Sequence, residues 1–354
     1  MKMANFPLPK DTGVSHVNGV PAVQADVAVM GSVVIDRGPI GDIAALAESS
    51  TVVVTNASAD SISVLDAASL AVERDIAVDG EPSAVVMTED RAYVSTSSEN
   101  YDAVAVIDLA SGTMIATYPL AFSVTALAVS PDGKRVYAGR TGHNQVDVAV
   151  IDTTAERVGT IDIATGAGIG IDSVMTDPNG KRLYVATTDD RGSRLVVVDT
   201  ETAAVDRTVW VGSPIRDLAF ADGTVYVLTS DRVRGGVVCV IDLATNRITD
   251  TVELGGAPTQ MTMSPDKTQA YIVDYDRIAV LCTLSLDVVD TISIGERPAC
   301  VAVGAEGTRL SVADYSGGVT VFAVTSTLPL LYSQLMATDP ISLSPRRKLE
   351  PAAV

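Results

Sequence analysis

The sequence predicts an all-β fold in which one four-stranded unit is repeated seven times. Three observations support this prediction. An apolar segment ending in aspartate occurs five times at intervals of 42 to 47 residues, which is typical of repeat folds. Two degenerate copies follow it, with Cys282 and Ala323 in the place of the aspartate. No 3.6-residue periodicity interrupts the units, so helical repeats are excluded. The five aspartates are Asp66, Asp108, Asp152, Asp199 and Asp242.

Each unit contains the same elements in the same order. A short apolar strand leads through an Asp or Gly turn to a strand around tyrosine, and a polar loop then leads to the strand that ends in aspartate. A fourth strand follows, such as the one in 251–258, TVELGGAP. Short strands rich in Val, Ile and Tyr and bounded by turn residues form antiparallel sheets. One such sheet cannot bury both faces alone, so we expect a single seven-bladed β-propeller of four-stranded antiparallel blades.

The two ends of the chain are expected to close the ring. The segment 31–43 resembles 291–303, which indicates a last strand leading into a first strand. We therefore predict that Ser32 to Asp36 pairs into the seventh blade and protects an otherwise open edge. The alternative last strand is 328–335, and whichever segment does not hold that slot would add outside it.

Three regions follow from this assignment. Residues 1–24 are expected to form a disordered arm, 25–336 the propeller and 337–354 a C-terminal tail.

Composition restricts the partners. The formal charge of -19 and an aromatic content of 4% argue against nucleic acid, which needs clustered Lys and Arg or aromatic stacking platforms. No apolar leader or membrane-length segment is visible, so a cytoplasmic location is the default expectation unless an export signal was removed, and membrane insertion is not expected. The three cysteines match no zinc or disulfide spacing and are expected to lie in the core.

The tyrosine strands carry a family resemblance. They read RAYVST at 91–96, RVYAGR at 135–140, RLYVAT at 182–187 and TVYVLT at 224–229. Together with the SPDG turn at 130–133, the strands ending in aspartate and the GxxP segments that follow the fourth strands, they make about residues 31–327 resemble the YVTN-repeat family of β-propellers. That family is similar in fold to the lactonase-type seven-bladed propellers. Its wider group binds ligands, occupies cell surfaces or hydrolyses sugar-acid lactones, so the resemblance implies the fold more specifically than the function.

Two conspicuous motifs are interpreted as structural. SPDGKRVYAG at 130–139 and DPNGKRLYVA at 177–186 contain Asp-Gly and Asn-Gly, which are hairpin signals. The repeated aspartates lie far apart in a radial array and are expected to cap the following turns.

The loops between second and third strands are expected to form an acidic face. This face would suit a cationic ligand or a protein partner, and a divalent cation is an alternative without a supporting motif. No cofactor is predicted, and the protein is expected to be a monomer. The residues of this face are Asp60, Glu99, Asp102, His143, Asp189, Asp190, Asp231, Asp274, Asp276 and Asp314.

The mouth of the channel is the second candidate. Alignment on the GxxP turns places seven residues in equivalent positions, namely Gly41, Ala84, Thr125, Asp172, Arg216, Gln260 and Cys300, with Asp42 and Asp217 one residue further. Asp172 and Arg216 come from neighbouring blades, so they form either an ion pair or part of a site for a polar ligand. The predicted ligand-binding residues are Asp42, Thr125, Asp172, Arg216, Asp217 and Gln260.

Catalysis has little support in the sequence. Of two histidines, His16 lies in the arm, and His143 is the remaining candidate base. A lactonase would need a carboxylate or His143 beside an arginine, which makes Asp172, Arg216 and His143 the catalytic candidates. The leading hypothesis is a non-catalytic protein that binds a small ligand or a protein partner through the acidic face and channel mouth. A lactonase-like hydrolase and a purely structural scaffold are the alternatives.

Overall fold

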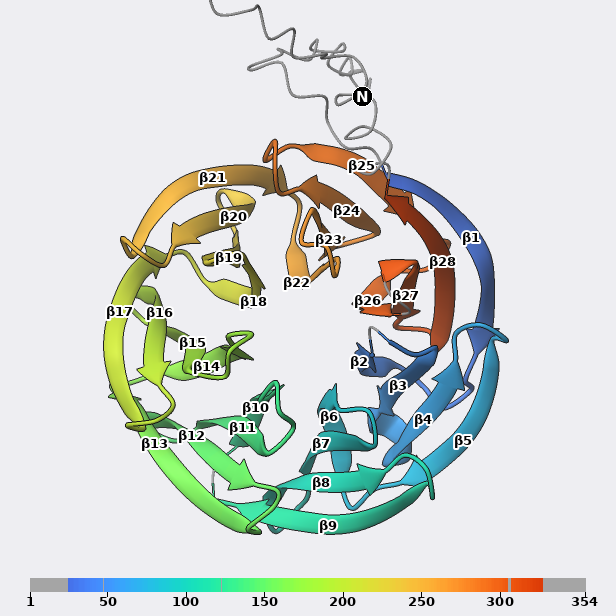
Figure 1. Ribbon diagram of the computed structural model, residues 1–354, viewed down its shortest axis with the longest axis horizontal. Coiled ribbons are helices and arrows are strands. Elements are labelled where there is room, and N and C mark those ends of the chain that lie inside the picture. The colour runs from blue at the N-terminus through green and yellow to red at the C-terminus, as the bar shows by residue number, and fades with distance from the viewer. Residues whose placement is uncertain (1–24, 47, 122, 305–306, 327–354) are drawn as a thin grey trace, which may run out of the picture.

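The computed structural model describes residues 25–46, 48–121, 123–304 and 307–326. In these residues, seven four-stranded antiparallel sheets form a ring around a central channel (Figure 1). The first strand of each blade lines the channel and the fourth lies at the perimeter. The predicted all-β seven-bladed propeller is therefore confirmed.

Six blades come from consecutive segments of the chain. The first blade contains β2 (Ile40–Ala45), β3 (Thr51–Asn56), β4 (Ser61–Asp66) and β5 (Ala71–Ala77), with the short 3-10 helix η1 (Ala57–Ala59) between β3 and β4. The second contains β6 (Glu81–Met87), β7 (Arg91–Ser97), β8 (Asp102–Asp108) and β9 (Thr113–Leu120). The third contains β10 (Ser123–Val129), β11 (Arg135–Thr141), β12 (Gln145–Asp152) and β13 (Arg157–Thr165).

The fourth blade contains β14 (Gly170–Thr176), β15 (Arg182–Asp189), β16 (Gly192–Asp199) and β17 (Ala204–Gly212). The fifth contains β18 (Ile215–Ala221), β19 (Thr224–Asp231), β20 (Gly235–Asp242) and β21 (Arg247–Gly255). The sixth contains β22 (Pro258–Met263), β23 (Gln269–Asp274), β24 (Arg277–Cys282) and β25 (Val288–Ser293).

Both ends of the described chain build the seventh blade. Its strands are β26 (Pro298–Gly304), β27 (Arg309–Asp314), β28 (Gly318–Ser326) and β1 (Ala25–Val34). β1 pairs antiparallel with β28, with Ser32 opposite Thr320 and Val34 opposite Gly318. The predicted closure by an N-terminal strand is confirmed, although β1 begins earlier than expected and ends before Asp36, whose positive φ of 55° turns the chain. The alternative strand 328–335 lies outside the described residues.

The hydrophobic cores lie between neighbouring blades. Val148 of the third blade, for example, packs in one cluster with Ile171 and Val185 of the fourth. The tyrosines of the second strands are buried in these interfaces, and four of them are only 1% exposed: Tyr93, Tyr137, Tyr184 and Tyr271. The three cysteines are free and buried, as expected.

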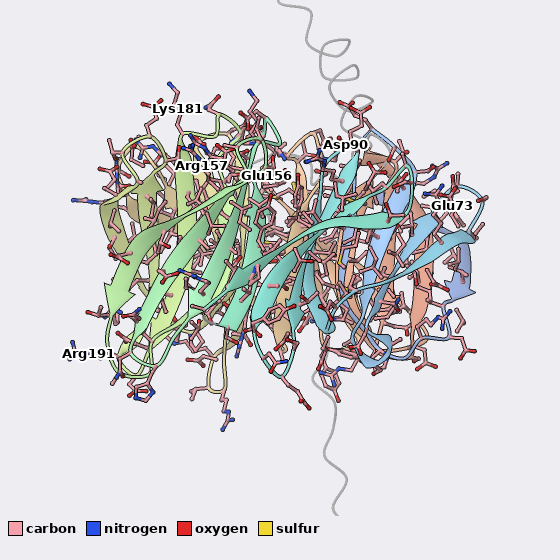
Figure 2. The ribbon with its side chains drawn as sticks, turned by 90° about the horizontal axis from the view of Figure 1, so that it is seen from below. Glu73, Asp90, Glu156, Arg157, Lys181 and Arg191 are labelled. Atoms are coloured by element: carbon pink, nitrogen blue, oxygen red, sulfur yellow. The ribbon has the colours of Figure 1, made fainter. Side chains whose placement is uncertain are left out.

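The ring has two distinct ends (Figure 2). The turns between first and second strands, such as the one at Lys181, lie at one end, which we call the turn face. The loops between second and third strands, such as the one at Arg191, lie at the other end, which we call the entrance face. The described residues include no helix with the length and apolar character needed to cross a membrane.

The repeated motifs are turns, as predicted. In the SPDG turn, Ser130 Oγ donates a 2.6 Å hydrogen bond to Asp132 Oδ1, and Gly133 adopts a positive φ of 69°. Asp199 illustrates the repeated aspartates, because its Oδ1 accepts hydrogen bonds from the backbone amides of Glu201 (3.0 Å) and Thr202 (2.8 Å). Hydrogen bonds from the turn lower the pKa of this exposed carboxyl.

Candidate functional site

A cavity of about 640 Å3 lies in the channel beneath the entrance face. All seven inner strands contribute to its wall. The structure brings together every residue predicted to bind a ligand, since the lining includes Asp42, Thr125, Asp172, Arg216, Asp217 and Gln260.

An irregularity in each inner strand shapes this cavity. The register of β18 shifts between Ile215 and Asp217, so Arg216 has no partner on β19 and is an extra residue at the channel wall. The same β-bulge recurs in all seven blades. Such bulges re-aim side chains and are frequent next to functional sites. We call bulge positions Gly41, Ser83, Thr125, Asp172, Arg216, Thr259 and Ala299.

The residue after each bulge forms a second ring. We call these following positions Asp42, Ala84, Ala126, Ser173, Asp217, Gln260 and Cys300.

The alignment on prolines was wrong by one residue in three blades. It placed Ala84, Gln260 and Cys300 at bulge positions, whereas Gln260 and Cys300 are the paired residues after the bulge and Ala84 lies, like them, two residues after a paired proline. The physical reason is that the proline occupies two different positions relative to the first paired residue of the inner strand. Pro258 is itself paired, opposite Asp274, while Pro214 precedes the paired residue Ile215.

Asp42 connects three blades through its carboxylate. Its Oδ2 accepts a 2.9 Å hydrogen bond from the backbone amide of Val85 in the second blade. Its Oδ1 accepts from its neighbour Ile43 (2.9 Å) and from Nε2 of Gln260 (3.1 Å), which reaches it from the sixth blade. The other amide atom of Gln260, Oε1, accepts a 2.7 Å hydrogen bond from the amide of Val301 in the seventh blade.

Asp217 repeats this arrangement on the fifth blade. Its Oδ2 accepts a hydrogen bond from the amide of Met261 in the sixth blade (2.9 Å). Its Oδ1 accepts from the amide of Leu218 (2.8 Å) and from the hydroxyl of Ser173 in the fourth blade (3.0 Å). The carboxylates at the following positions therefore hold neighbouring inner strands together.

Burial raises the pKa of both carboxyl groups. For Asp42 the loss of water raises the pKa from 3.8 to about 6, and the negative charge of Asp217 adds to the effect. For Asp217 burial likewise raises the pKa to about 6. Hydrogen bonds from backbone amides oppose the shift in both but do not cancel it.

Arg216 and Asp172 occupy adjacent bulge positions without forming an ion pair. Among the described ion pairs, all with nitrogen-oxygen distances of 4.0 Å or less, none involves Arg216, and its side chain is exposed. Asp172 accepts a hydrogen bond from Thr188 Oγ1 instead. Burial raises the pKa of Asp172, and both this hydrogen bond and the charge of Arg216 act against that rise. A cation and a hydrogen-bond acceptor are thus presented side by side to the cavity.

The other predicted residues differ in position. Thr125 is exposed at its bulge position and donates a 2.9 Å hydrogen bond from Oγ1 to the carbonyl of Ile171. His143 lies exposed in the loop between β11 and β12 and does not line the cavity. His16 lies outside the described residues.

Several carboxylates of the predicted acidic face have partners of their own. Several of its carboxylates hold their own loops, as Asp231 does by accepting hydrogen bonds from the amides of Val233 (2.7 Å) and Arg234 (2.6 Å). Others are paired with cations, as Asp189 is with Arg194 at 2.7 Å. The arginines that end or flank these loops were missing from the prediction.

An arginine held between two tyrosines was also missed. The guanidinium carbon of Arg297 lies 5.1 Å from the ring centroid of Tyr275 and 5.0 Å from that of Tyr315. The two tyrosines are 59% and 46% exposed. A sequence signal existed, because each tyrosine follows an aspartate at the same loop position of neighbouring blades, in DYDR and DYSG.

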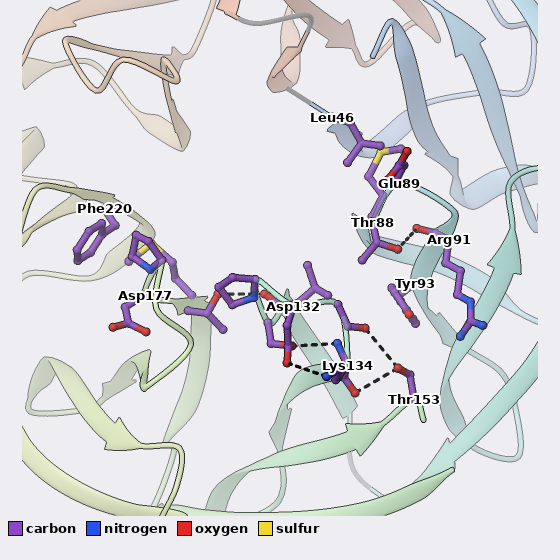
Figure 3. A pocket seen from close by; sticks show the side chains of 18 of the residues that line it. Leu46, Thr88, Glu89, Arg91, Tyr93, Asp132, Lys134, Thr153, Asp177 and Phe220 are labelled. Carbon is purple, nitrogen blue, oxygen red and sulfur yellow. Dashed lines mark hydrogen bonds and ion pairs between the residues drawn. The ribbon is translucent and has the colours of Figure 1, made fainter. Parts of the chain in front are cut away.

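A larger cavity opens on the turn face (Figure 3). It measures about 860 Å3, and its lining includes the SPDG turn. Some of its polar groups are engaged in turns: Thr153 Oγ1 donates to the carbonyl of Lys134 (3.1 Å), and Asp132 accepts from the Lys134 amide (3.1 Å). The entrance cavity places Arg216, which takes part in no described ion pair, beside the half-buried Asp172 at the adjacent bulge position, and this pairing makes the entrance the candidate ligand site. In the described part of the chain, no three His, Cys, Asp or Glu side chains gather in a way that could hold a metal ion.

Comparison with known proteins shows the family. The chain is 55% identical to a seven-bladed beta-propeller protein of Mycolicibacterium smegmatis, over 89% of this chain and 86% of that protein. It is 36% identical to a seven-bladed beta-propeller protein of Mycobacterium tuberculosis, over 83% of this chain and 84% of that protein. No family model matches the chain.

A solved structure shows the same architecture. A chain of hydrazine synthase from Kuenenia stuttgartiensis superposes with a TM-score of 0.70, covering 82% of this chain and 96% of that chain. At 22% identity, this likeness concerns the fold alone. Together with the two mycobacterial relatives, the sevenfold ring establishes that the chain belongs to the seven-bladed beta-propeller proteins.

Proposed function

We propose that this protein is a non-catalytic binding protein that takes a small polar ligand at the channel entrance. The observation that carries the proposal is Arg216, a charged side chain that lines the cavity and takes part in no described ion pair. A guanidinium offers five donors in a fixed plane and suits carboxylate or phosphate groups. A cavity of about 640 Å3 falls within the usual size range of small-molecule sites.

The neighbouring bulge positions supply the rest of the recognition. Asp172 offers an acceptor for a hydroxyl or amine of the ligand, while Thr125 and Thr259 offer hydroxyl groups on either side. Asp42, Asp217 and Gln260 contribute indirectly, because their hydrogen bonds between blades fix the strands that carry these groups. Because these hydrogen bonds hold the strands in place, the site is preformed and loses little conformational entropy when a ligand binds.

A lactonase-like hydrolase is a second candidate on one specific ground. Asp172 has a raised pKa and lies beside an arginine, which is the pairing that water activation and carbonyl binding would require. The variant Asp172→Asn separates the two functions, because it would abolish hydrolysis of a lactone such as gluconolactone while leaving binding through Arg216 largely intact. Binding without turnover by the wild-type protein supports the non-catalytic proposal.

The test is calorimetric titration of sugar acids, hydroxy acids, amino acids and neutral sugars into wild-type protein, Arg216→Ala and Arg157→Ala. Arg157 is exposed on the turn face and serves as the matched control (Figure 2). We expect saturable binding of at least one compound. Its affinity should fall by about tenfold or more in Arg216→Ala and stay unchanged in Arg157→Ala. Equal affinities in all three proteins, or no binding at all, would contradict the proposal.

A further inference from the structure

The channel entrance has a side recess that contains a second arginine. This recess of about 470 Å3 shares Asp172, Arg216 and Thr259 with the channel cavity and adds Arg297. We call it the arginine recess; its other lining residues are Ile215, Ser230, Ala257 and Pro258.

We infer that the arginine recess binds the oxyanion group of the ligand, a carboxylate or a phosphate, between Arg216 and Arg297. The inference rests on the proposed function and adds the chemical class of the ligand. Two cations and one carboxylate line the recess, so its local charge is positive in a protein whose formal charge is -19. Two guanidiniums that face one space repel each other until an anion lies between them.

The position of Arg297 is fixed before any ligand arrives. Its guanidinium is stacked between the rings of Tyr275 and Tyr315, which come from corresponding loops of the sixth and seventh blades. Stacking on two rings stabilises the charge and restricts a side chain that is otherwise costly to immobilise. The donor edges of a stacked guanidinium remain available for an oxyanion.

The acidic side chains that precede the two tyrosines are engaged elsewhere. Asp274, which precedes Tyr275, accepts hydrogen bonds from Arg277 (2.9 and 3.0 Å) and from the amide of Ala257 (2.7 Å). Asp314, which precedes Tyr315, accepts from the amides of Ser316 (2.8 Å) and Gly318 (2.9 Å).

Glu296 also points to a different partner, since it accepts a 3.3 Å hydrogen bond from Ser316 Oγ and does not line the recess. None of the described ion pairs therefore neutralises Arg297.

The wall beside Thr259 is built for close approach. Gly256 has a positive φ of 59°, and a side chain there would collide with the carboxylate of Asp274. This glycine lets Asp274 hold the amide of Ala257, and so sets the course of the chain through Pro258 and Thr259 along the recess.

The inference is tested with citrate and inorganic phosphate as probes, titrated calorimetrically at constant ionic strength, with glycerol as the neutral comparison. The variants are Arg297→Gln, Arg297→Lys and, as control, Arg234→Gln in the loop between β19 and β20 of the same face. We expect one-to-one binding of at least one anion by the wild-type protein. Arg297→Gln should weaken it by about tenfold, Arg297→Lys by less, and Arg234→Gln by less than about twofold.

Unchanged binding in Arg297→Gln, or an equal loss in Arg234→Gln, would overturn the inference, because the anion would then sense only the overall charge. Binding of a neutral or cationic compound that depends on Arg216, without any binding of citrate or phosphate, would also overturn it while leaving the proposed function intact. If no compound binds and Arg216→Ala changes nothing, both proposals fail.

Discussion

The polar side chains at the bulge positions and at the following positions of the inner strands have different roles. At the bulge positions, Arg216 and Thr125 are exposed to the channel entrance. At the following positions, Asp217 and Gln260 are engaged in hydrogen bonds to the backbone of the next blade. Side chains that are accessible to a ligand and side chains that hydrogen-bond one blade to the next are therefore only one residue apart in the sequence. A polar residue in a propeller channel is a candidate for binding only when its own hydrogen bonds leave it available.

The strongest test of this comparison is removal of a carboxylate that connects blades. Asp42→Ala leaves the amides of Ile43 and Val85 and the side-chain amide of Gln260 without their acceptor. Each buried donor that loses its partner costs about 1 to 3 kcal/mol. We expect the free energy of unfolding at pH 5 to fall by about 3 kcal/mol in denaturant titrations. Arg216→Ala, the matched bulge variant, should stay within about 0.5 kcal/mol of wild type.

The pH dependence of stability gives the next largest effect. The pKa of Asp42 and Asp217 is about 6 in the folded protein and 3.8 ordinarily, so the folded state binds protons more tightly than the unfolded state. Their contribution is fully present below about pH 4 and is lost as the pH rises through 6. Turn aspartates such as Asp199, whose pKa is lowered, act in the opposite direction and lose their contribution as the pH falls below 4.

We therefore expect unfolding free energies measured from pH 3 to 8 to be highest near pH 4 to 5 and to decline by roughly 2 to 3 kcal/mol toward pH 7. In the double variant Asp42→Asn with Asp217→Asn, the decline between pH 5 and 7 should be largely absent. A decline of the same size in that variant would assign it to other groups.

A substitution of Gln260 tests the hydrogen bonds between blades without changing the charge of the protein. Gln260→Ala removes the acceptor for the amide of Val301 and one donor to Asp42, without removing a charged group. The expected loss is about 1 to 2 kcal/mol in thermal or denaturant unfolding. Thr259→Ala is the adjacent control at the bulge position. An equal loss in both variants would contradict the division between the two positions.

The smallest effect is expected at Thr125. Its hydroxyl donates one hydrogen bond to Ile171 of the next blade, but the side chain is exposed and water can replace the bond. Thr125→Ala should cost about 0.5 kcal/mol or less while weakening ligand binding by a few fold. A stability loss as large as that of Gln260→Ala would show that the bulge positions also hold the ring.

The fold could be predicted because both the strands and the turns repeat in the sequence, for example the strand ending in Asp199 and the turn at Gly133. The prediction also placed six polar residues around one cavity, because inner strands of equal phase meet at the channel. The alignment on prolines was wrong by one residue where the proline is itself paired, as Pro258 is, because no residue type in the sequence identifies the position of a β-bulge. The prediction missed Arg297, because the shared Asp-Tyr loop position marks the two tyrosines but does not show that the ring places both beside this arginine.

The pairing of β1 with β28 has a consequence for synthesis of the chain. Six blades are encoded in contiguous segments and have their partners nearby, whereas Ser32 finds Thr320 only after almost the whole ring has been made. Loop closure over such a distance is slow compared with local hairpin formation. Until the ribosome has released residues 318–326, β1 has no partner strand and remains an unpaired edge. The nascent chain stops exposing this edge only when the seventh blade is completed.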